Sequence, residues 1–347
     1  MKHRTRAAVS CSALLFWSGL LCAVLPAGAG AQTVGSTAAA PVVDMATVQV
    51  SGEQPGPGLW KVTAANGHVL WVLGTVSPMP QRVEWRSDEV QRVIDQADHV
   101  LGAPGWTIDA DIGFFRGLTL LPLARRTARD PQGRSLQDVL PPASYARWLR
   151  LKQANMGRDR SVEKERPMAA SARLYGAFLK RNGLRDGRQV RKALEDAYDR
   201  NDLKPEDTRL KLEVGNVRDT LRQMQSAEVD DRACFERTLD TVDYMAPVLR
   251  ERATAWAVGD VAALRRLAVS GMAQTCLDAV VESDMAKRRG WTQLEARSKA
   301  RWLQLAQGAL ATHSVTFATL PVSRMLGTGN YLDALAQRGF TVEAPPE

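Results

Sequence analysis

The chain contains few of the side chains that usually bind metal ions. Its 347 residues include only four histidines and four cysteines. No two histidines stand four residues apart, and no Cys-x-x-Cys occurs. The local motifs of zinc proteases and zinc fingers are therefore absent, because those sites need closely spaced His or Cys ligands.

The chain also lacks a second long apolar run and a strong cluster of basic residues. A single apolar stretch near the N-terminus excludes a protein that crosses a membrane several times. The formal net charge is +8, but basic residues gather only in short runs such as Arg125-Arg126 and Lys287–Arg289. Without a basic patch or a recognition motif, the sequence predicts no nucleic-acid partner. Its 45% hydrophobic and 24% charged content is typical of a globular protein with a sizeable core.

The first 31 residues have the pattern of a secretory signal peptide. Three basic residues lie among the first six, an apolar run covers Ala13–Pro26, and Ala29-Gly30-Ala31 offers a cleavage site. We therefore predict cleavage after Ala31 and a periplasmic or secreted protein with no transmembrane span after cleavage. An uncleaved signal anchor is the alternative, but the short apolar run followed by small residues favours cleavage.

Two of the four cysteines lie within the predicted signal peptide. Cleavage would remove Cys11 and Cys22, and it would lower the net charge from +8 to +5 because residues 1–31 contain three basic and no acidic residues. Cys234 and Cys276 remain, and an oxidising compartment favours a disulfide between them. Such a bond would stabilise the fold by roughly 4 kcal/mol in the chain-entropy model. Two buried free thiols are the alternative.

A linker is predicted between the signal peptide and one domain at 59–347. Residues 32–58 are rich in Ala, Gly and Pro, so they cannot bury enough apolar surface to order themselves. The domain begins with two strand-like runs at 59–63 and 68–73, and Asn66-Gly67 between them predicts a type I′ hairpin turn. The second run is almost wholly apolar, which places it inside a sheet.

The rest of the domain combines a long helical middle with strands near the C-terminus. Ser87 is expected to cap a helix before a short strand at 99–101. Helical spacing covers 142–156, 167–181, 188–200, 228–257, 273–288 and 291–311. A strand pattern interrupts it at 209–214, and a strand, a helix and a strand follow at 315–320, 329–338 and 340–342. We predict an α/β (α+β) fold whose central mixed sheet takes strands from both chain ends.

Several short blocks resemble one known family. They are Leu59–Val62, Leu73–Val76, Ala255-Trp256 with Gly259-Asp260, Leu326-Gly327 and Arg338–Val342. Their order and spacing are similar to those of the TraB/GumN family (TraB/PrgY/GumN, of the Tiki-like superfamily) over residues 59–343. The resemblance implies a Gly-Thr-x-His motif, one glutamate after the next strand, a second glutamate mid-chain, and a late Gly-x-x-His. In Tiki-like proteins, such histidines and carboxylates imply a divalent-metal site for peptide hydrolysis.

This chain departs from the family pattern at most of the implied ligand positions. Those positions hold Ser77, Ala103, Glu213 and Arg324. A protonated serine is a poor ligand, alanine has no donor atom, and arginine brings a permanent cation. We therefore predict no bound metal and no other cofactor. The protein is expected to lack hydrolase activity, although the residues leave its status as an enzyme uncertain.

The former active-site cleft remains the predicted ligand-binding site. Its candidate residues are Gly74, Thr75, Ser77, Glu213 and Arg324. One hypothesis is that Arg324 and Glu213 fill the old metal position as a buried ion pair. Ser77 is expected to be a loop serine and not a nucleophile, because it lacks the Gly-x-Ser-x-Gly setting and an evident histidine base.

Three functions are compatible with this sequence. The first is an exported, pseudoenzyme-like domain that binds an envelope peptide, protein or polysaccharide. The second is a divergent Tiki-like metal-dependent peptidase with a rearranged centre that uses Glu213. The third is a structural envelope protein without a small ligand. The sequence favours the first. His68, His99 and His313 are expected to serve packing or element ends, and not metal binding.

Overall fold

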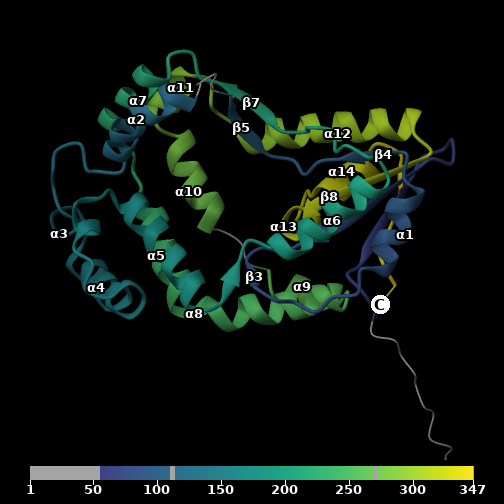
Figure 1. The fold of residues 1–347 in the computed structure, drawn as a ribbon, viewed down its shortest axis with the longest axis horizontal. Helices are drawn as coiled ribbons and strands as arrows, with labels where there is room; N and C mark the ends of the chain where they lie inside the picture. The colour runs from purple at the N-terminus through teal and green to yellow at the C-terminus, as the bar shows by residue number, and fades with distance from the viewer. Residues whose placement is uncertain (1–54, 110–113, 269–271, 347) are drawn as a thin grey trace, which may run out of the picture. The chain divides into compact units, whose positions relative to one another are not determined.

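A five-stranded mixed sheet forms the centre of the domain (Figure 1). The computed structural model describes residues 55–109, 114–268 and 272–346. Across the sheet the strand order is β4-β8-β2-β1-β9, with β4, β8 and β2 parallel to one another and β1 antiparallel to both of its neighbours, β2 and β9. The strands are β1 Leu59–Thr63, β2 Val69–Thr75, β4 His99–Leu101, β8 Val315–Pro321 and β9 Thr341–Glu343. The predicted α/β class, with a sheet built from both chain ends, is confirmed.

Helices cover both faces of this sheet, which explains why its central strands are so apolar. On β2, Leu70 and Val72 are buried together with residues of α12 (Leu294–Thr312). Leu73 faces the other way and is buried with residues of α1 (Asp88–Gln96) and α6 (Arg188–Arg200). Because successive side chains of a strand point to opposite faces, a strand covered on both sides needs apolar residues throughout.

The first hairpin forms where it was predicted, but with a different turn. Gly67 has φ +85°, whereas Asn66 is not among the residues with positive φ. A type I′ turn needs positive φ at both positions, so that prediction was wrong. The Gly67 amide donates to the Ala64 carbonyl, and the Ala64 amide donates to the His68 carbonyl. This pattern gives a three-residue loop with glycine in the left-handed position.

Ser87 stands at the start of α1, but its side chain does not cap the backbone. Its hydroxyl accepts a hydrogen bond of 2.5 Å from the side-chain Nε2 of Gln91, one turn into the helix. The predicted position of the helix start is therefore confirmed, and the predicted capping bond is not.

Several helices of the middle segment match their predicted bounds. These are α4 Pro142–Met156, α5 Pro167–Arg181 and α6. The segment predicted at 228–257 begins later, as α8 Arg232–Ala257. The segment predicted at 273–288 divides into α10 Met272–Val281 and α11 Asp284–Arg288, because the Ser283 hydroxyl accepts from the Ala286 amide and starts a new helix. Further elements are α2 Phe114–Thr127, α3 Leu136–Val139, the 3-10 helix Ser161–Lys164, α7 Val217–Ser226, α9 Val261–Arg266, α13 Val322–Met325 and α14 Tyr331–Ala336.

Two small ribbons lie outside the central sheet. β3 (Met79–Pro80) pairs antiparallel with β6 (Leu184–Arg185). β5 (Trp106–Asp109) pairs in parallel with β7 (Leu210–Glu213), which is the strand predicted at 209–214. The strand that carries Glu213 therefore belongs to a separate ribbon.

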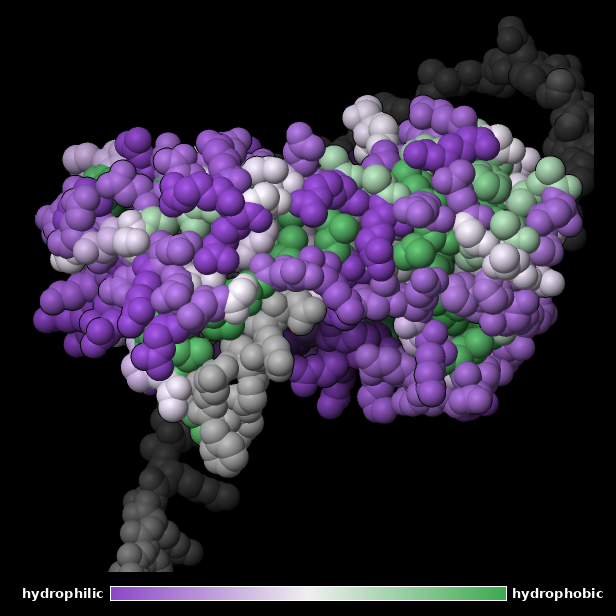
Figure 2. All heavy atoms as spheres, turned by 90° about the horizontal axis from the view of Figure 1, so that it is seen from above, coloured by the Kyte–Doolittle hydropathy of each residue, from purple (hydrophilic) through white to green (hydrophobic). Residues whose placement is uncertain are grey.

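The sulfur atoms of Cys234 on α8 and Cys276 on α10 lie 2.02 Å apart, at disulfide-bonding distance. None of the helices in the described ranges is both long and apolar enough to cross a membrane. On the face shown in Figure 2, hydrophilic side chains cover most of the surface and hydrophobic residues occur in small groups. The predicted signal peptide and the linker up to residue 54 lie outside the described residues.

Candidate functional site

Three of the four predicted site positions lie at one edge of the central sheet. Ser77 follows the end of β2, Ala103 follows β4, and Arg324 lies in α13, directly after β8. These three strands are parallel neighbours in the order β4-β8-β2. Their carboxyl ends therefore meet at the same edge, which is where ligands commonly bind in open α/β sheets.

The end of β2 is closely packed. The Trp256 indole nitrogen donates a 2.6 Å hydrogen bond to the Gly74 carbonyl, and the Thr75 hydroxyl donates to the Leu320 carbonyl at 3.3 Å. A Cβ atom on Gly74 would come within 2.9 Å of the Val322 side chain. Glycine is needed there because α13 approaches the strand closely. Gly74 thus packs against α13, and Thr75 is tied to the end of β8.

Ser77 lies beyond this packed region and is exposed. Its hydroxyl makes no hydrogen bond with any described residue, so no neighbouring base activates it. The geometry therefore agrees with a loop serine. A nucleophilic serine would need a base within hydrogen-bond reach.

The Gly-Asp block after α8 also serves packing. Gly259 has φ +72°, and a Cβ atom there would lie 2.8 Å from the Gly56 carbonyl oxygen. Asp260 accepts a 2.7 Å hydrogen bond from the Ala263 amide and so caps α9. This block therefore turns the chain from α8 into α9 beneath residues 55–58.

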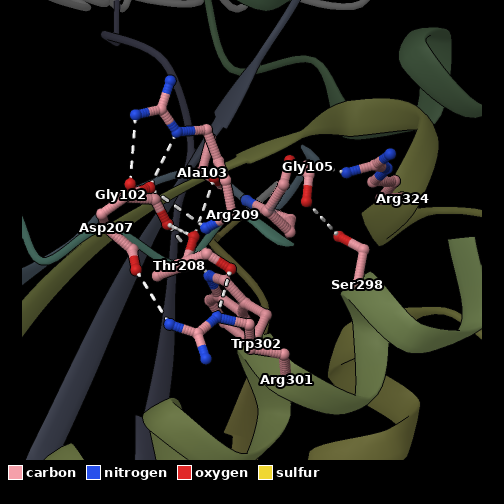
Figure 3. Close-up of polar contacts among 11 residues, drawn as sticks. Gly102, Ala103, Gly105, Asp207, Thr208, Arg209, Ser298, Arg301, Trp302 and Arg324 are labelled. Carbon is pink, nitrogen blue, oxygen red and sulfur yellow. Dashed lines mark hydrogen bonds and ion pairs between the residues drawn. The ribbon is translucent and has the colours of Figure 1, made fainter. Parts of the chain in front are cut away.

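The loop after β4 is held by side chains that donate to its carbonyl oxygens (Figure 3). The Trp302 indole nitrogen donates to the Gly102 carbonyl at 3.1 Å. The Thr208 hydroxyl lies 3.1 Å from the Gly102 carbonyl and 2.9 Å from the Ala103 carbonyl. The Ser298 hydroxyl donates to the Gly105 carbonyl at 3.2 Å. Ala103 itself is exposed and contributes only backbone to this network.

Arg324 completes the network from α13. Its guanidinium donates to the Pro104 carbonyl at 2.8 Å and to the Glu295 carboxylate at 2.6 Å. The guanidinium carbon lies 6.0 Å from the ring centroid of Tyr331. Burial of the Tyr331 hydroxyl raises its pKa to about 12. Arg324 thus joins the loop after β4 to α12 and α14.

The hypothesised ion pair between Arg324 and Glu213 is wrong. Arg324 is paired with Glu295, which lies in the first turn of α12. Glu213 stands at the exposed end of β7, and its side chain forms no hydrogen bond or ion pair with any described residue. The reason is topological: α12 packs along the central sheet and brings Glu295 to its edge, whereas β7 pairs with β5 outside that sheet and leaves Glu213 exposed.

The residues at this edge do not fit a divalent metal ion. They offer a hydroxyl, a methyl group, and a guanidinium already bonded to a carbonyl and a carboxylate. Within the ranges that the structure describes, no group of three or more His, Cys, Asp or Glu residues is placed to hold a metal. Metal sites of the implied type need several such donors around one ion.

The three histidines in the described ranges lie away from this edge. His99 and His313 stand at the opposite, amino-terminal side of β4 and β8, and their rings stack with centroids 4.2 Å apart. The His99 ring is 3.1 Å from the Glu206 carboxylate. His68 contacts the Leu310 carbonyl at 3.0 Å. Each therefore has a local structural partner.

Sequence reasoning missed Thr208, Ser298 and Trp302. The last two carry a recognisable signal, because they stand four residues apart on one helix and both are fully buried. A buried serine hydroxyl and a buried indole nitrogen each need an acceptor, and together they indicate that α12 faces backbone carbonyls.

Comparison with known proteins identifies one family. The family described as TraB/PrgY/gumN matches residues 58–344, which is nearly the whole described domain. No curated protein and no solved structure matches the chain.

Proposed function

The chain belongs to the TraB/PrgY/gumN family, and from that premise we propose that it is an exported, pseudoenzyme-like member. Its domain binds an envelope peptide, protein or polysaccharide and does not hydrolyse a peptide bond at a metal centre. The binding site lies at the edge where β2, β4 and β8 end.

One observation carries this proposal. Arg324 stands where the family resemblance implies a histidine, and its guanidinium is bonded to the Pro104 carbonyl and to Glu295. A permanent cation in that position repels a divalent ion. Its hydrogen bonds also anchor the loop after β4. An anchored loop has less conformational freedom to lose when a ligand binds, which suits recognition.

Export is supported by the sequence pattern of residues 1–31 and by the cysteine pair at bonding distance. A disulfide persists in the periplasm or outside the cell and is rare in the cytosol. N-terminal sequencing of the protein purified from its periplasmic or culture fraction tests this part of the proposal. A mature chain that begins at Gln32 is the expected result, and a retained Met1 would contradict it.

The metal question is tested by titrating the purified protein with zinc, manganese and cobalt. A ligand that binds only the folded state must raise the melting temperature. We expect no copurified metal and no shift, and the same behaviour for Glu213→Ala. Stoichiometric metal with a clear stabilisation that Glu213→Ala abolishes would overturn the proposal and favour the divergent metallopeptidase.

A further inference from the structure

Arg252 is a buried arginine without a counter-charge. It lies on α8, and only 6% of its surface is exposed. Its Nε atom is buried with no hydrogen-bond partner, and no ion pair joins it to any described residue. An arginine remains protonated in proteins, so this position holds a nearly uncompensated positive charge.

The position of Arg252 on α8 places it next to the candidate site. Trp256 follows it by four residues, so both side chains lie on one face of the helix. Trp256 donates to the Gly74 carbonyl at the end of β2. Arg252 is therefore one helical turn from the point where α8 meets the sheet edge.

Tyr175 lies on α5, a helix that packs on α8. Burial raises the pKa of the Tyr175 hydroxyl, and the charge of Arg252 opposes that effect. The hydroxyl makes no hydrogen bond with any described residue. A guanidinium and a phenol on two packed helices thus both have donor capacity that no described residue uses.

A buried and unpaired charge destabilises the folded state. Desolvation of an ion is unfavourable unless a counter-charge or hydrogen bonds compensate it. A negatively charged ligand group would supply both. The guanidinium is suited to an oxyanion, because its planar N–H groups can donate two parallel hydrogen bonds.

We infer that Arg252 and Tyr175 form a binding site for an oxyanion of the ligand, either a carboxylate or a phosphate or sulfate group. This inference rests on the proposed binding role and specifies the charge of its ligand. The strand β3 packs on α8 and lines a cavity of about 590 Å³ together with the start of α6, although Arg252 and Tyr175 are not among the residues that line it.

The rim of that cavity carries a positive charge. Arg185 and Arg188 line it and form no ion pair with any described residue. Lys192 adds a third cation, which pairs with Asp196, and the acid in the lining, Asp186, pairs with Arg191. Such a field would draw anionic groups towards β3 and the end of α8.

The test is a thermal-shift titration of the full chain in a low-chloride buffer with acetate, phosphate or sulfate at matched ionic strength. The wild type is expected to gain stability with at least one oxyanion. Arg252→Met is expected to melt higher than the wild type without added oxyanion, because a buried unpaired charge is removed, and to lose the oxyanion effect. Tyr175→Phe is expected to weaken the effect.

Arg250→Met is the matched control, because Arg250 lies on the same helix but is exposed and bonds the Asn182 carbonyl. It should retain the full oxyanion effect. Arg252→Lys keeps the charge and loses the paired N–H groups, so at least tenfold weaker binding is expected even if Arg252→Met fails to fold. A response to acetate identifies a carboxylate ligand, and a response to phosphate or sulfate alone identifies those groups.

Two results would overturn the inference. One is an oxyanion shift that is the same in the wild type, Arg252→Met and Arg252→Lys. The other is no oxyanion shift in the wild type. Neither bears on the metal titration, so failure of this site and failure of the proposed function are distinguishable.

Discussion

Replacing Arg324 with methionine should destabilise the fold by removing the anchor of the loop after β4. Methionine keeps the apolar volume over Tyr331 but loses both polar contacts of the guanidinium. The charge-assisted bond to the Pro104 carbonyl contributes about 1.5–3 kcal/mol. The pair with Glu295 is partly exposed, so screening limits it to about 0.2–1 kcal/mol.

The expected loss is therefore about 2–4 kcal/mol in the free energy of unfolding. The assay is urea denaturation followed by tryptophan fluorescence, with the melting temperature as a second measure. Trp302 donates to the same loop and is a natural reporter of its environment. A fall in melting temperature of at least about 4 °C is expected.

Two control variants separate the contributions. Glu295→Gln removes the charge of the partner but leaves the bond to Pro104, so it should cost about 1 kcal/mol or less. Arg338→Met removes an arginine just after α14 that bonds the Ala334 carbonyl of that helix, and it should stay within about 0.5 kcal/mol of the wild type. If Arg324→Met is no more destabilising than Arg338→Met, the reasoning about the anchored loop is refuted.

Three further predictions concern the rest of the fold. Cys234→Ser should lower stability by about 4 kcal/mol under oxidising conditions and have a much smaller effect under reducing conditions, which comparative denaturation would show. Although burial raises the pKa of Asp243, hydrogen bonds and charges from Arg150 and Arg147 lower it below its ordinary 3.8. Its stabilising effect should be complete above pH 3.8 and be lost as the pH falls through the lower folded-state pKa. In Asp243→Asn, the free energy of unfolding should therefore fall less steeply with decreasing pH over this range. Trp302→Phe should cost about 1–3 kcal/mol, because it leaves the Gly102 carbonyl with one donor fewer and opens space in the core; a loss below about 0.5 kcal/mol would contradict this.

The sequence contained enough information for the elements whose patterns are local. The helix at 142–156 begins with proline at its first position, as does the one at 167–181, and both start where predicted. The apolar run of β2 required a position between covered faces. The hairpin turn was harder, because Asn66-Gly67 fits both a two-residue and a three-residue loop.

Local sequence patterns could not predict which distant strands and side chains pair with each other. Nothing local indicates that β7 pairs with β5 and stays apart from the central sheet. The ion-pair partner of Arg324 could not be predicted for the same reason. Glu213 and Glu295 are both carboxylates that can pair with an arginine, and only the tertiary structure decides which one lies close to it. The periodicity of α12 indicated which of its faces is buried, but not which strand end Glu295 would reach.

The length of α8 has a mechanical consequence. Its early residues, such as Phe235, pack with the helical middle, and Trp256 near its end packs with the sheet. A continuous helix of 26 residues spans roughly 39 Å, so one rigid rod belongs to both hydrophobic clusters. Neither cluster can unfold without disturbing that helix. The domain should therefore melt as one cooperative unit. Local opening of α8 is expected first at Pro247, where the helix lacks a backbone hydrogen bond.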